Sequence, residues 1–216
     1  MDIQSECVAA KEEHDVWAKA LPVVRAWVVL TVGLFLFAVS IVLLVKSDLG
    51  LGPWDIFHVG FSKVSGLSLG QVSIVTGVVV IGVAYAIARV KPGLGTLANM
   101  VLIGVFIDWV NGPTPTMTYL PFKVAMFASG MVLMGLASAV YISAGLGAGP
   151  RDSLMLGVHQ ATGRSIGVAR TIVEAAVFVA GFLMGGKFGL GTILFVVGIG
   201  PLVQAFFSLF RIDPHR

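Results

Sequence analysis

The chain alternates between long apolar runs and short segments rich in glycine, proline or charge. Six apolar runs, each nearly free of charged residues, cover residues 26–45, 69–88, 94–110, 124–143, 165–186 and 188–210. About 20 apolar residues in an α-helix cross the roughly 30 Å hydrocarbon core of a bilayer. The pattern therefore predicts six transmembrane helices. Residues 111–121 contain three prolines and predict a loop in the middle of the chain.

The two halves of the chain share motifs that recur after 96 to 97 residues. LGLGPWD at residues 49–55 and LGAGPRD at residues 146–152 are identical at five of seven positions. GLGT follows in each half, at residues 93–96 and 189–192. Each half thus has one span, a GxGPxD segment and two further spans. Because three is an odd number, the second half is expected to be inverted in the membrane relative to the first, a common transporter construction.

This repeat predicts the domain organisation. A charged cytoplasmic tail at residues 1–22 precedes the first three-span repeat, residues 23–111. The extracytoplasmic loop at residues 112–122 leads to the second repeat, residues 123–211, and residues 212–216 form a cytoplasmic tail. The predicted fold class is an all-α, polytopic transmembrane helix bundle. Its six spans form a 3+3 inverted repeat, with a short broken or re-entrant helix after the first span of each half.

Composition narrows the class of protein. Hydrophobic residues make up 57% of the chain and charged residues 12%, with a mean hydropathy of +0.97. An ordinary soluble domain has about 25% charged residues, so a water-soluble enzyme is excluded. A single cysteine, Cys7, excludes a disulfide framework and a cysteine-based zinc site. With no basic stripe for nucleic acid and no HExxH, GxSxG, P-loop or CxxC motif, we expect neither an enzyme nor a cofactor or metal.

The basic residues predict the orientation. If both termini lie inside, ten of the 14 lysines and arginines fall on the inner side, and these ten include every arginine. Cytoplasmic segments carry the excess of Lys and Arg in membrane proteins. We therefore expect a multi-pass protein of the bacterial inner membrane with both termini in the cytoplasm. The lipid bilayer is its expected partner, and the sequence leaves the oligomeric state open.

Each GxGPxD segment predicts a short helix. Proline suits the first helical position, because its missing N–H has no partner there. The expected helices, residues 53–64 and 150–161, are about 18 Å long. They are too short to cross a bilayer, so they either lie at its surface or enter it part-way. We expect the glycines and prolines of the repeated motifs to be structural: Gly50, Gly52, Pro53, Gly147, Gly149, Pro150, Gly93, Gly95, Gly189 and Gly191.

The motif glycines carry a prediction about packing. Gly52 and Gly149 precede the prolines and are expected to need a conformation or a closeness that a side chain would block. We therefore expect both to tolerate substitution less well than Gly33, which lies within the first span.

Polar residues of the short helices are candidates for a substrate or ion pathway. Asp55 and His58 share one helix face, and Asp152 and His159 share the corresponding stripe in the second half. In the functional interpretation, two opposed half-helices build a polar site from these groups, and Arg151 is a further candidate for it. The alternative is that each aspartate only caps its helix and each histidine faces the lipid headgroups.

Other ionisable residues inside the predicted spans are further candidates. Arg170 and Glu174 lie one turn apart on the fifth span, where they form either a local ion pair or part of a relay. Asp108 closes the third span and is expected either to be solvated at the interface or to line a pore.

The order of these motifs resembles a known family. Six spans, LGxGPxD after the first and GLGT opening the third are similar to the YczE/YitT-type integral membrane proteins of bacteria. The resemblance covers residues 23–210. It implies a location and a fold, and it supplies no catalytic residues.

The sequence favours a small-solute permease or secondary transporter with a central site between inverted repeats. A non-transporting membrane accessory or scaffold protein is the alternative, and an intramembrane enzyme ranks third. Transport predicts a polar cavity between the halves that contains both aspartates. An accessory role predicts a closed, apolar centre.

Overall fold

Eight helices make up the described part of the chain. The computed structural model describes the backbone of residues 3–89, 91–147 and 149–211, and side chains from residue 21 onward. Over these residues the chain is all-α, without strands. The helices are α1 (Ile3–Ser47), α2 (Pro53–Ser65), α3 (Leu69–Ala88), α4 (Leu94–Asn111), α5 (Leu120–Ser143), α6 (Pro150–Thr162), α7 (Ile166–Leu183) and α8 (Leu190–Leu209).

The six predicted spans are confirmed as helices. Six helical segments are long and apolar enough to cross a membrane: Leu21–Ser47 of α1 and the whole of α3, α4, α5, α7 and α8. The first span begins earlier than predicted, and α1 continues without a break from Ile3 through Pro22. The residues expected to form a separate tail therefore extend the first helix.

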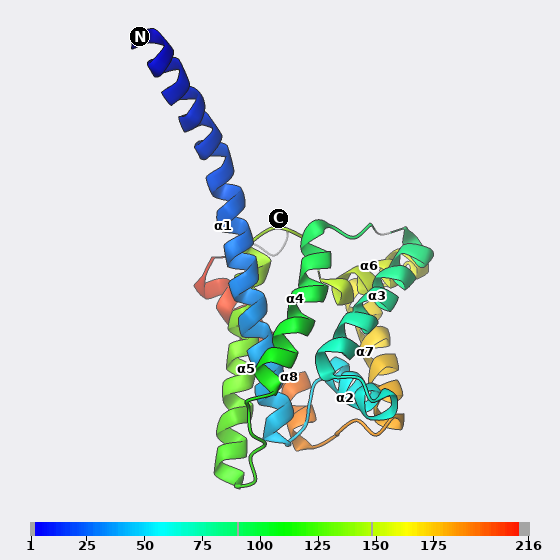
Figure 1. Ribbon diagram of the computed structural model, residues 1–216. Helices are drawn as coiled ribbons and strands as arrows, with labels where there is room; N and C mark the ends of the chain where they lie inside the picture. The colour runs from blue at the N-terminus through cyan, green and yellow to red at the C-terminus, as the bar shows by residue number, and fades with distance from the viewer. Residues whose placement is uncertain (1–2, 90, 148, 212–216) are drawn as a thin grey trace.

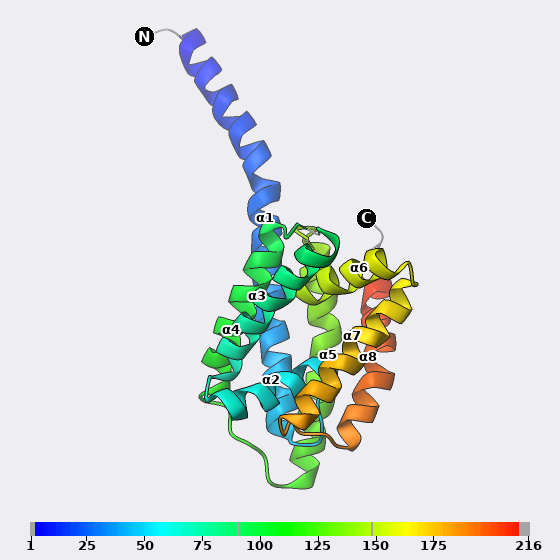
Figure 2. The ribbon, with the colours of Figure 1, turned by 90° about the vertical axis from the view of Figure 1, so that its right-hand side faces the viewer.

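The spans alternate in direction along the bundle (Figures 1 and 2). The segment of α1 before its span and the C-terminal end of α8 lie toward one end, which we call the terminal end. The loops after α1, α4 and α7 lie at the other end, which we call the distal end. Helices α1 and α5 pack against each other, with α4 against α1 and α8 against α5. Helix α2 packs on α7, and α6 packs on α3.

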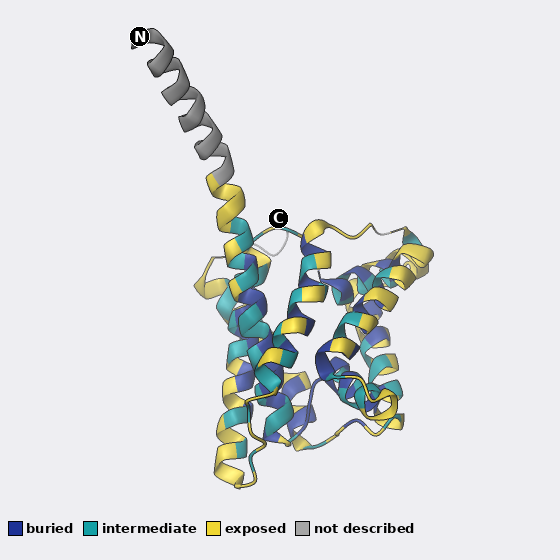
Figure 3. Ribbon diagram, in the orientation of Figure 1, coloured by how far each residue is buried: buried dark blue, intermediate teal, exposed yellow. Residues whose placement is uncertain are grey.

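The core follows one face of α1. Leu30, Leu34, Ala38 and Ile41 recur every three to four residues and are at most 2% exposed. This spacing places them on one side of a helix. The dark interior of Figure 3 is surrounded by exposed positions. Many of these are large apolar side chains, such as Leu183 and Leu190 at 79% and 80% exposure, which suits a surface covered by lipid tails.

Gly33 lies where α1 crosses α5, and it contradicts the expected ranking of glycines. A Cβ on Gly33 would lie 2.6 Å from the backbone nitrogen of Tyr141. A Cβ on Gly149 would lie no closer than 3.4 Å to its neighbours, an ordinary contact, and a Cβ on Gly52 would meet the Phe195 ring. The prediction that Gly149 tolerates a side chain less well than Gly33 is therefore wrong. Sequence position does not reveal how closely two backbones cross.

We expect Gly33→Ala to destabilise the protein more than Gly149→Ala. The Gly33 methyl group must push two backbones apart, and overpacking of this kind costs about 1–3 kcal/mol. The Gly149 backbone has φ −66°, which alanine adopts without strain. The thermal midpoints of the two purified variants in detergent measure the difference. Equal midpoints would mean that α1 and α5 separate more easily than the packing implies.

The alternation of spans gives a second prediction. Lys91 lies in the loop at the terminal end, and Thr116 lies in the loop at the distal end. In a chain without Cys7, Lys91→Cys and Thr116→Cys should react with a membrane-impermeant thiol reagent from opposite sides of the membrane. From the distribution of arginines we expect Thr116 to be outside. Reaction of both cysteines from the same side would overturn the six-span arrangement.

Candidate functional site

The duplicated glycine motifs pack across the two halves of the chain. The residues before α2 contact the start of α8: Leu51 N–H donates to Thr192 Oγ1 at 3.1 Å, and Gly191 N–H donates to the Leu49 carbonyl at 2.9 Å. In the other half, Gly95 at the start of α4 lies against the backbone of Leu146, which precedes α6. Each LGxG segment is therefore held by the GLGT segment of the opposite half.

Positive backbone φ angles explain two of these glycines. Gly50 has φ 139° and Gly147 has φ 120°, in a region that side chains rarely adopt. These residues turn the chain toward Gly52 and Gly149, which are the N-cap residues of α2 and α6. Proline follows at the first helical position, as predicted. The observed helices are one residue longer than predicted, at 13 residues each.

A cavity of about 280 Å³ lies where the two short helices begin. Both ends that carry Gly-Pro line it, and so do Asp55 and Asp152. The remaining ionisable lining groups are His58, Arg151, Arg170 and Glu174. Apolar side chains from all six spans complete the wall: Phe37, Val80, Ile103, Met134, Val173 and Phe195 are among them. Six of the seven predicted pathway residues therefore border one cavity.

Asp55 and Arg151 form the charged centre of this cavity. The Asp55 side chain is 3% exposed, and its Oδ1 lies 3.7 Å from Arg151 Nη2. This separation permits ionic attraction but exceeds the usual 2.7–3.2 Å of a hydrogen bond. The Arg151 guanidinium also lies over the Trp54 ring, 5.0 Å from its centroid, in a cation–π contact. Trp54 and Arg151 occupy corresponding positions of the repeat, so the one chemical difference within the two motifs becomes a contact between them.

Asp55 and Asp152 have different structural roles. Asp152 Oδ2 accepts the Gly149 N–H at 3.2 Å, so Asp152 caps α6 as the alternative interpretation expected. Asp55 Oδ1 has no hydrogen-bond partner among the described residues, although it is buried. A buried carboxylate without such partners is costly unless another charge compensates for it. The capping interpretation therefore holds for Asp152 and does not describe Asp55.

The histidines differ as well. His58 is 2% exposed, and its Nδ1 has no hydrogen-bond partner in the described structure. His159 lies away from the cavity lining, and its Nδ1 is 2.5 Å from the carbonyl oxygen of Arg164. The structure thus brings Asp55 and His58 to the cavity together, but it separates His159 from Asp152. His159 instead stabilises the turn that ends α6.

The expected ion pair on α7 is confirmed. Arg170 Nε donates to Glu174 Oε1 at 2.9 Å, and both residues border the cavity. With 59% of the Arg170 side chain exposed, this pair is at the accessible edge of the cavity rather than in its depth.

Sequence reasoning missed the neutral polar residues of the cavity. Asn99 is 8% exposed and lines the cavity beside Gly149. Thr76, Ser138 and Tyr141 also line it. Single polar residues in apolar spans gave the only signal, and that signal does not say which face each helix turns inward.

Asp108 has a structural role that neither expectation foresaw. It accepts hydrogen bonds from Ser68 Oγ at 2.5 Å and Gly70 N–H at 2.8 Å. It therefore completes the N-terminal cap of α3, where free N–H groups favour a negative charge.

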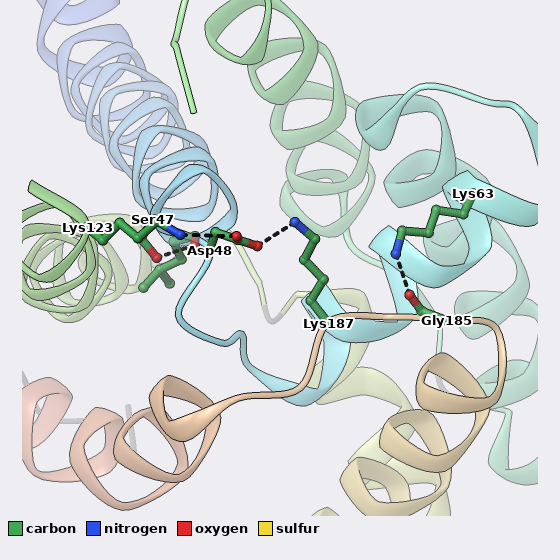
Figure 4. A network of polar contacts seen from close by, with 7 residues as sticks. Ser47, Asp48, Lys63, Lys123, Gly185 and Lys187 are labelled. Carbon is green, nitrogen blue, oxygen red and sulfur yellow. Dashed lines mark hydrogen bonds and ion pairs between the residues drawn. The ribbon is translucent and has the colours of Figure 1, made fainter. Parts of the chain in front are cut away.

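A cluster of charges joins loops at the distal end, as Figure 4 shows. Asp48 pairs with Lys187 and with Lys123, the latter at 3.2 Å. Lys63 Nζ donates to the Gly185 carbonyl at 2.6 Å nearby. The hydrogen bond from Lys187, together with Lys123, lowers the pKa of Asp48 against a weaker effect of burial. The cluster therefore stays paired at neutral pH and loses its pairing only in acid, as the pH falls through this lowered pKa.

No metal centre is evident in the described part of the chain. It contains no group of three or more His, Cys, Asp and Glu side chains placed to hold a metal ion.

The comparison with known proteins assigns the chain to a family. The model of a family of unknown function, DUF6198, matches residues 24–208. The chain belongs to this family. The match covers all six candidate spans except the ends of the first and last, together with both short helices.

The chain is also similar to three curated proteins, one of which is named as a membrane protein. The chain is 40% identical over 187 residues to the uncharacterized membrane protein YczE of Bacillus subtilis, which covers 86% of each chain. It is 35% identical over 190 residues to an uncharacterized protein of Haemophilus influenzae, covering 86% of this chain and 87% of that one. The uncharacterized protein YyaS of Bacillus subtilis is 31% identical over 181 residues, covering 82% and 90%. The resemblance seen in the sequence is confirmed, and no solved structure matches the chain significantly.

Proposed function

We propose that this multi-pass membrane protein is a secondary permease for a small solute, with its binding site in the cavity between the two halves. The observation that carries the proposal is the cavity itself. Its wall includes the beginnings of both short helices and a buried carboxylate, Asp55, whose Oδ1 makes no hydrogen bond. A protein with a purely structural role has no need of a costly charge beside an internal space.

Reciprocal contacts support an inverted repeat. Gly33 of α1 packs on Tyr141 of α5, and Gly130 of α5 packs on Leu44 of α1. Each residue of the first pair lies 97 positions from its counterpart in the second. Gly60 of α2 against Gly181 of α7 is matched in the same way by Gly157 of α6 against Ala84 of α3. Such reciprocity is what a pseudo-two-fold axis between the halves produces.

The placement of α2 and α6 supports re-entrant helices. Each has 13 residues and is therefore about 20 Å long, shorter than the hydrocarbon core. Figure 2 shows α2 in the lower part of the bundle and α6 in the upper part, both inclined across the spans. Their N-terminal ends meet at the cavity, so Arg151 of one reaches Asp55 of the other.

The charge cluster at the distal end supports alternating access. Asp48 follows α1 in the first half, whereas Lys123 and Lys187 belong to the second half. Exposed ion pairs contribute only about 0–1 kcal/mol each. Such contacts hold the distal end closed and separate at little cost when the halves move. In this proposal the terminal end faces the cytoplasm, because the sequence puts every arginine in segments expected on the inner side.

Chemical access to the cavity tests the proposal without knowledge of the substrate. Ser138 and Ser40 are both buried serines on spans, and both donate to a backbone carbonyl of their own helix. Ser138 lines the cavity and Ser40 does not. In a chain without Cys7, Ser138→Cys should react with an impermeant thiol reagent from outside in whole cells and from inside in inverted vesicles. The matched Ser40→Cys control should react from neither side.

The reactivity of Ser138→Cys also tests the alternative function, a non-transporting protein. A Ser138→Cys variant as unreactive as Ser40→Cys would show a closed centre, and it would favour a non-transporting accessory or scaffold protein. Reaction from one side only would contradict alternating access and would overturn the permease proposal.

A further inference from the structure

The cavity contains two opposite charges that are only loosely paired with each other, at 3.7 Å, among the described residues. The Arg151 guanidinium has five N–H donors, and none makes a hydrogen bond to another described residue. Asp55 Oδ1 is likewise without a hydrogen bond. The two groups face each other at 3.7 Å, close enough to attract but too far apart to satisfy each other.

We propose that this site binds a small zwitterion of the α-amino-acid type, with its carboxylate on Arg151 and its ammonium group on Asp55. The inference rests on the proposed function and specifies its substrate class. A carboxylate accepts two parallel N–H bonds from a guanidinium. An ammonium group donates to Asp55 Oδ1, and the unpaired His58 Nδ1 is a second polar atom at the same wall.

The spacing of the protein charges selects the spacing of the ligand charges. Because Arg151 Nη2 and Asp55 Oδ1 are only 3.7 Å apart, the ligand must carry its two charged groups close together. An α-amino acid carries both on one carbon atom. The N-terminal ends of α2 and α6 border the same space and favour the ligand carboxylate further.

A ligand with a single charge fits less well. A simple anion would lie beside the carboxylates of Asp55, Asp152 and Glu174. A simple cation would lie beside the guanidinium groups of Arg151 and Arg170. Only a ligand with one positive and one negative group can place each of them on an opposite charge while Asp55 and Arg151 stay where they are.

The apolar part of the cavity wall indicates the size and polarity of the ligand's side chain. Val80, Met100, Ile103 and Phe195 give the cavity an apolar wall beside the charged pair. The volume of about 280 Å³ is just below the roughly 300–1,000 Å³ of sites for drug-sized ligands. The structure therefore favours a small zwitterion with a short apolar side chain.

Three probes with one carbon skeleton test the assignment. Leucine has both charges, 3-methylbutylamine has only the ammonium group, and 4-methylpentanoate has only the carboxylate. Binding to the purified full-length protein in detergent is measured by calorimetry. Leucine should bind at least about tenfold more tightly than either analogue, because each analogue leaves one charged partner unmatched. Equal binding of leucine and one analogue, or no binding of leucine, would overturn the zwitterion assignment.

Two variants show which end of the ligand each residue holds. Arg151→Gln should weaken leucine binding about tenfold without weakening the binding of 3-methylbutylamine. Asp55→Asn should weaken leucine binding about tenfold without weakening the binding of 4-methylpentanoate. Arg164→Gln, an exposed arginine outside the cavity lining, is the matched control and should change nothing. A misfolded variant would lose the binding of all three probes together. Circular dichroism therefore checks that each variant is folded. If a folded variant loses all three probes, the assignment is wrong.

The substrate class and the permease function fail in different ways. If Ser138→Cys reacts from both sides but leucine does not bind, the permease proposal stands and the zwitterion assignment falls. If leucine binds but Ser138→Cys reacts from one side or neither, the site is a binding site in a protein that does not transport.

Discussion

Arg151→Gln is expected to destabilise the folded protein, and Asp55→Asn in the same chain is expected to restore most of the loss. The Asp55 side chain is 3% exposed, and Arg151 is the cation paired with it. Removing one partner of a buried pair leaves an uncompensated charge, which costs about 3–5 kcal/mol in proteins. Because one third of the Arg151 side chain is exposed, we expect about 3 kcal/mol or less.

The double variant separates charge from packing. Asparagine has nearly the shape of aspartate but no charge, so Arg151→Gln with Asp55→Asn leaves no unpaired ion in the cavity. The contact of Arg151 with the Trp54 ring is still lost, so recovery should be incomplete. Thermal unfolding of the parent, both single variants and the double variant in detergent gives the coupling between the two residues.

Two results would contradict this account. Strictly additive effects would mean that the two charges do not interact across the cavity. A parent-like midpoint for Arg151→Gln alone would mean that water already solvates Asp55. The matched control is Arg164→Gln, since Arg164 is an exposed arginine with no ion pair in the described structure.

Gly95→Ala is expected to have a large effect on the packing of the two halves. A Cβ on Gly95 would overlap the Leu146 carbonyl oxygen and lie 2.6 Å from its carbonyl carbon. These are backbone atoms, so no side-chain rotation relieves the clash. The segment before α6 would have to move, at a cost of about 3 kcal/mol.

Gly82→Ala is the control for this substitution. Gly82 lies in α3 with nothing within 4 Å of its Cβ position. Alanine favours a helix over glycine by about 1 kcal/mol, so Gly82→Ala should be neutral or stabilising. The yield of monodisperse protein from membranes and its thermal midpoint measure both variants. A Gly95→Ala protein as stable as Gly82→Ala would show that the two halves are not fixed by the glycine motifs.

Much of the fold could be predicted from the sequence because its signals are local. Each span is one uninterrupted apolar run, since a bilayer requires an apolar surface along the whole helix. The starts of α2 and α6 follow from proline at the first helical position. The ion pair between Arg170 and Glu174 follows from a spacing of four residues on one helix.

The roles of individual site residues were decided by tertiary structure. Asp55 and Asp152 occupy equivalent positions in the repeat, yet one faces Arg151 and the other caps its own helix. Asp108 lies at a span end in the sequence, but its partners, Ser68 and Gly70, come from the start of α3 in the preceding part of the chain. These differences depend on how far each helix is rotated and shifted against its neighbours, which no local pattern encodes.

By itself, the sequence determined that this chain has six candidate membrane spans, that its halves share a motif, and which residues are charged within an apolar chain. Only the tertiary structure decided which of these charges meet. It brought Trp54 and Arg151, which are 97 positions apart, into contact, and it made Gly33 a crossing point that the sequence had ranked as ordinary. The physical reason is that membrane insertion depends on hydrophobicity summed along each helix. A site depends on the few ångströms between backbones where helices cross.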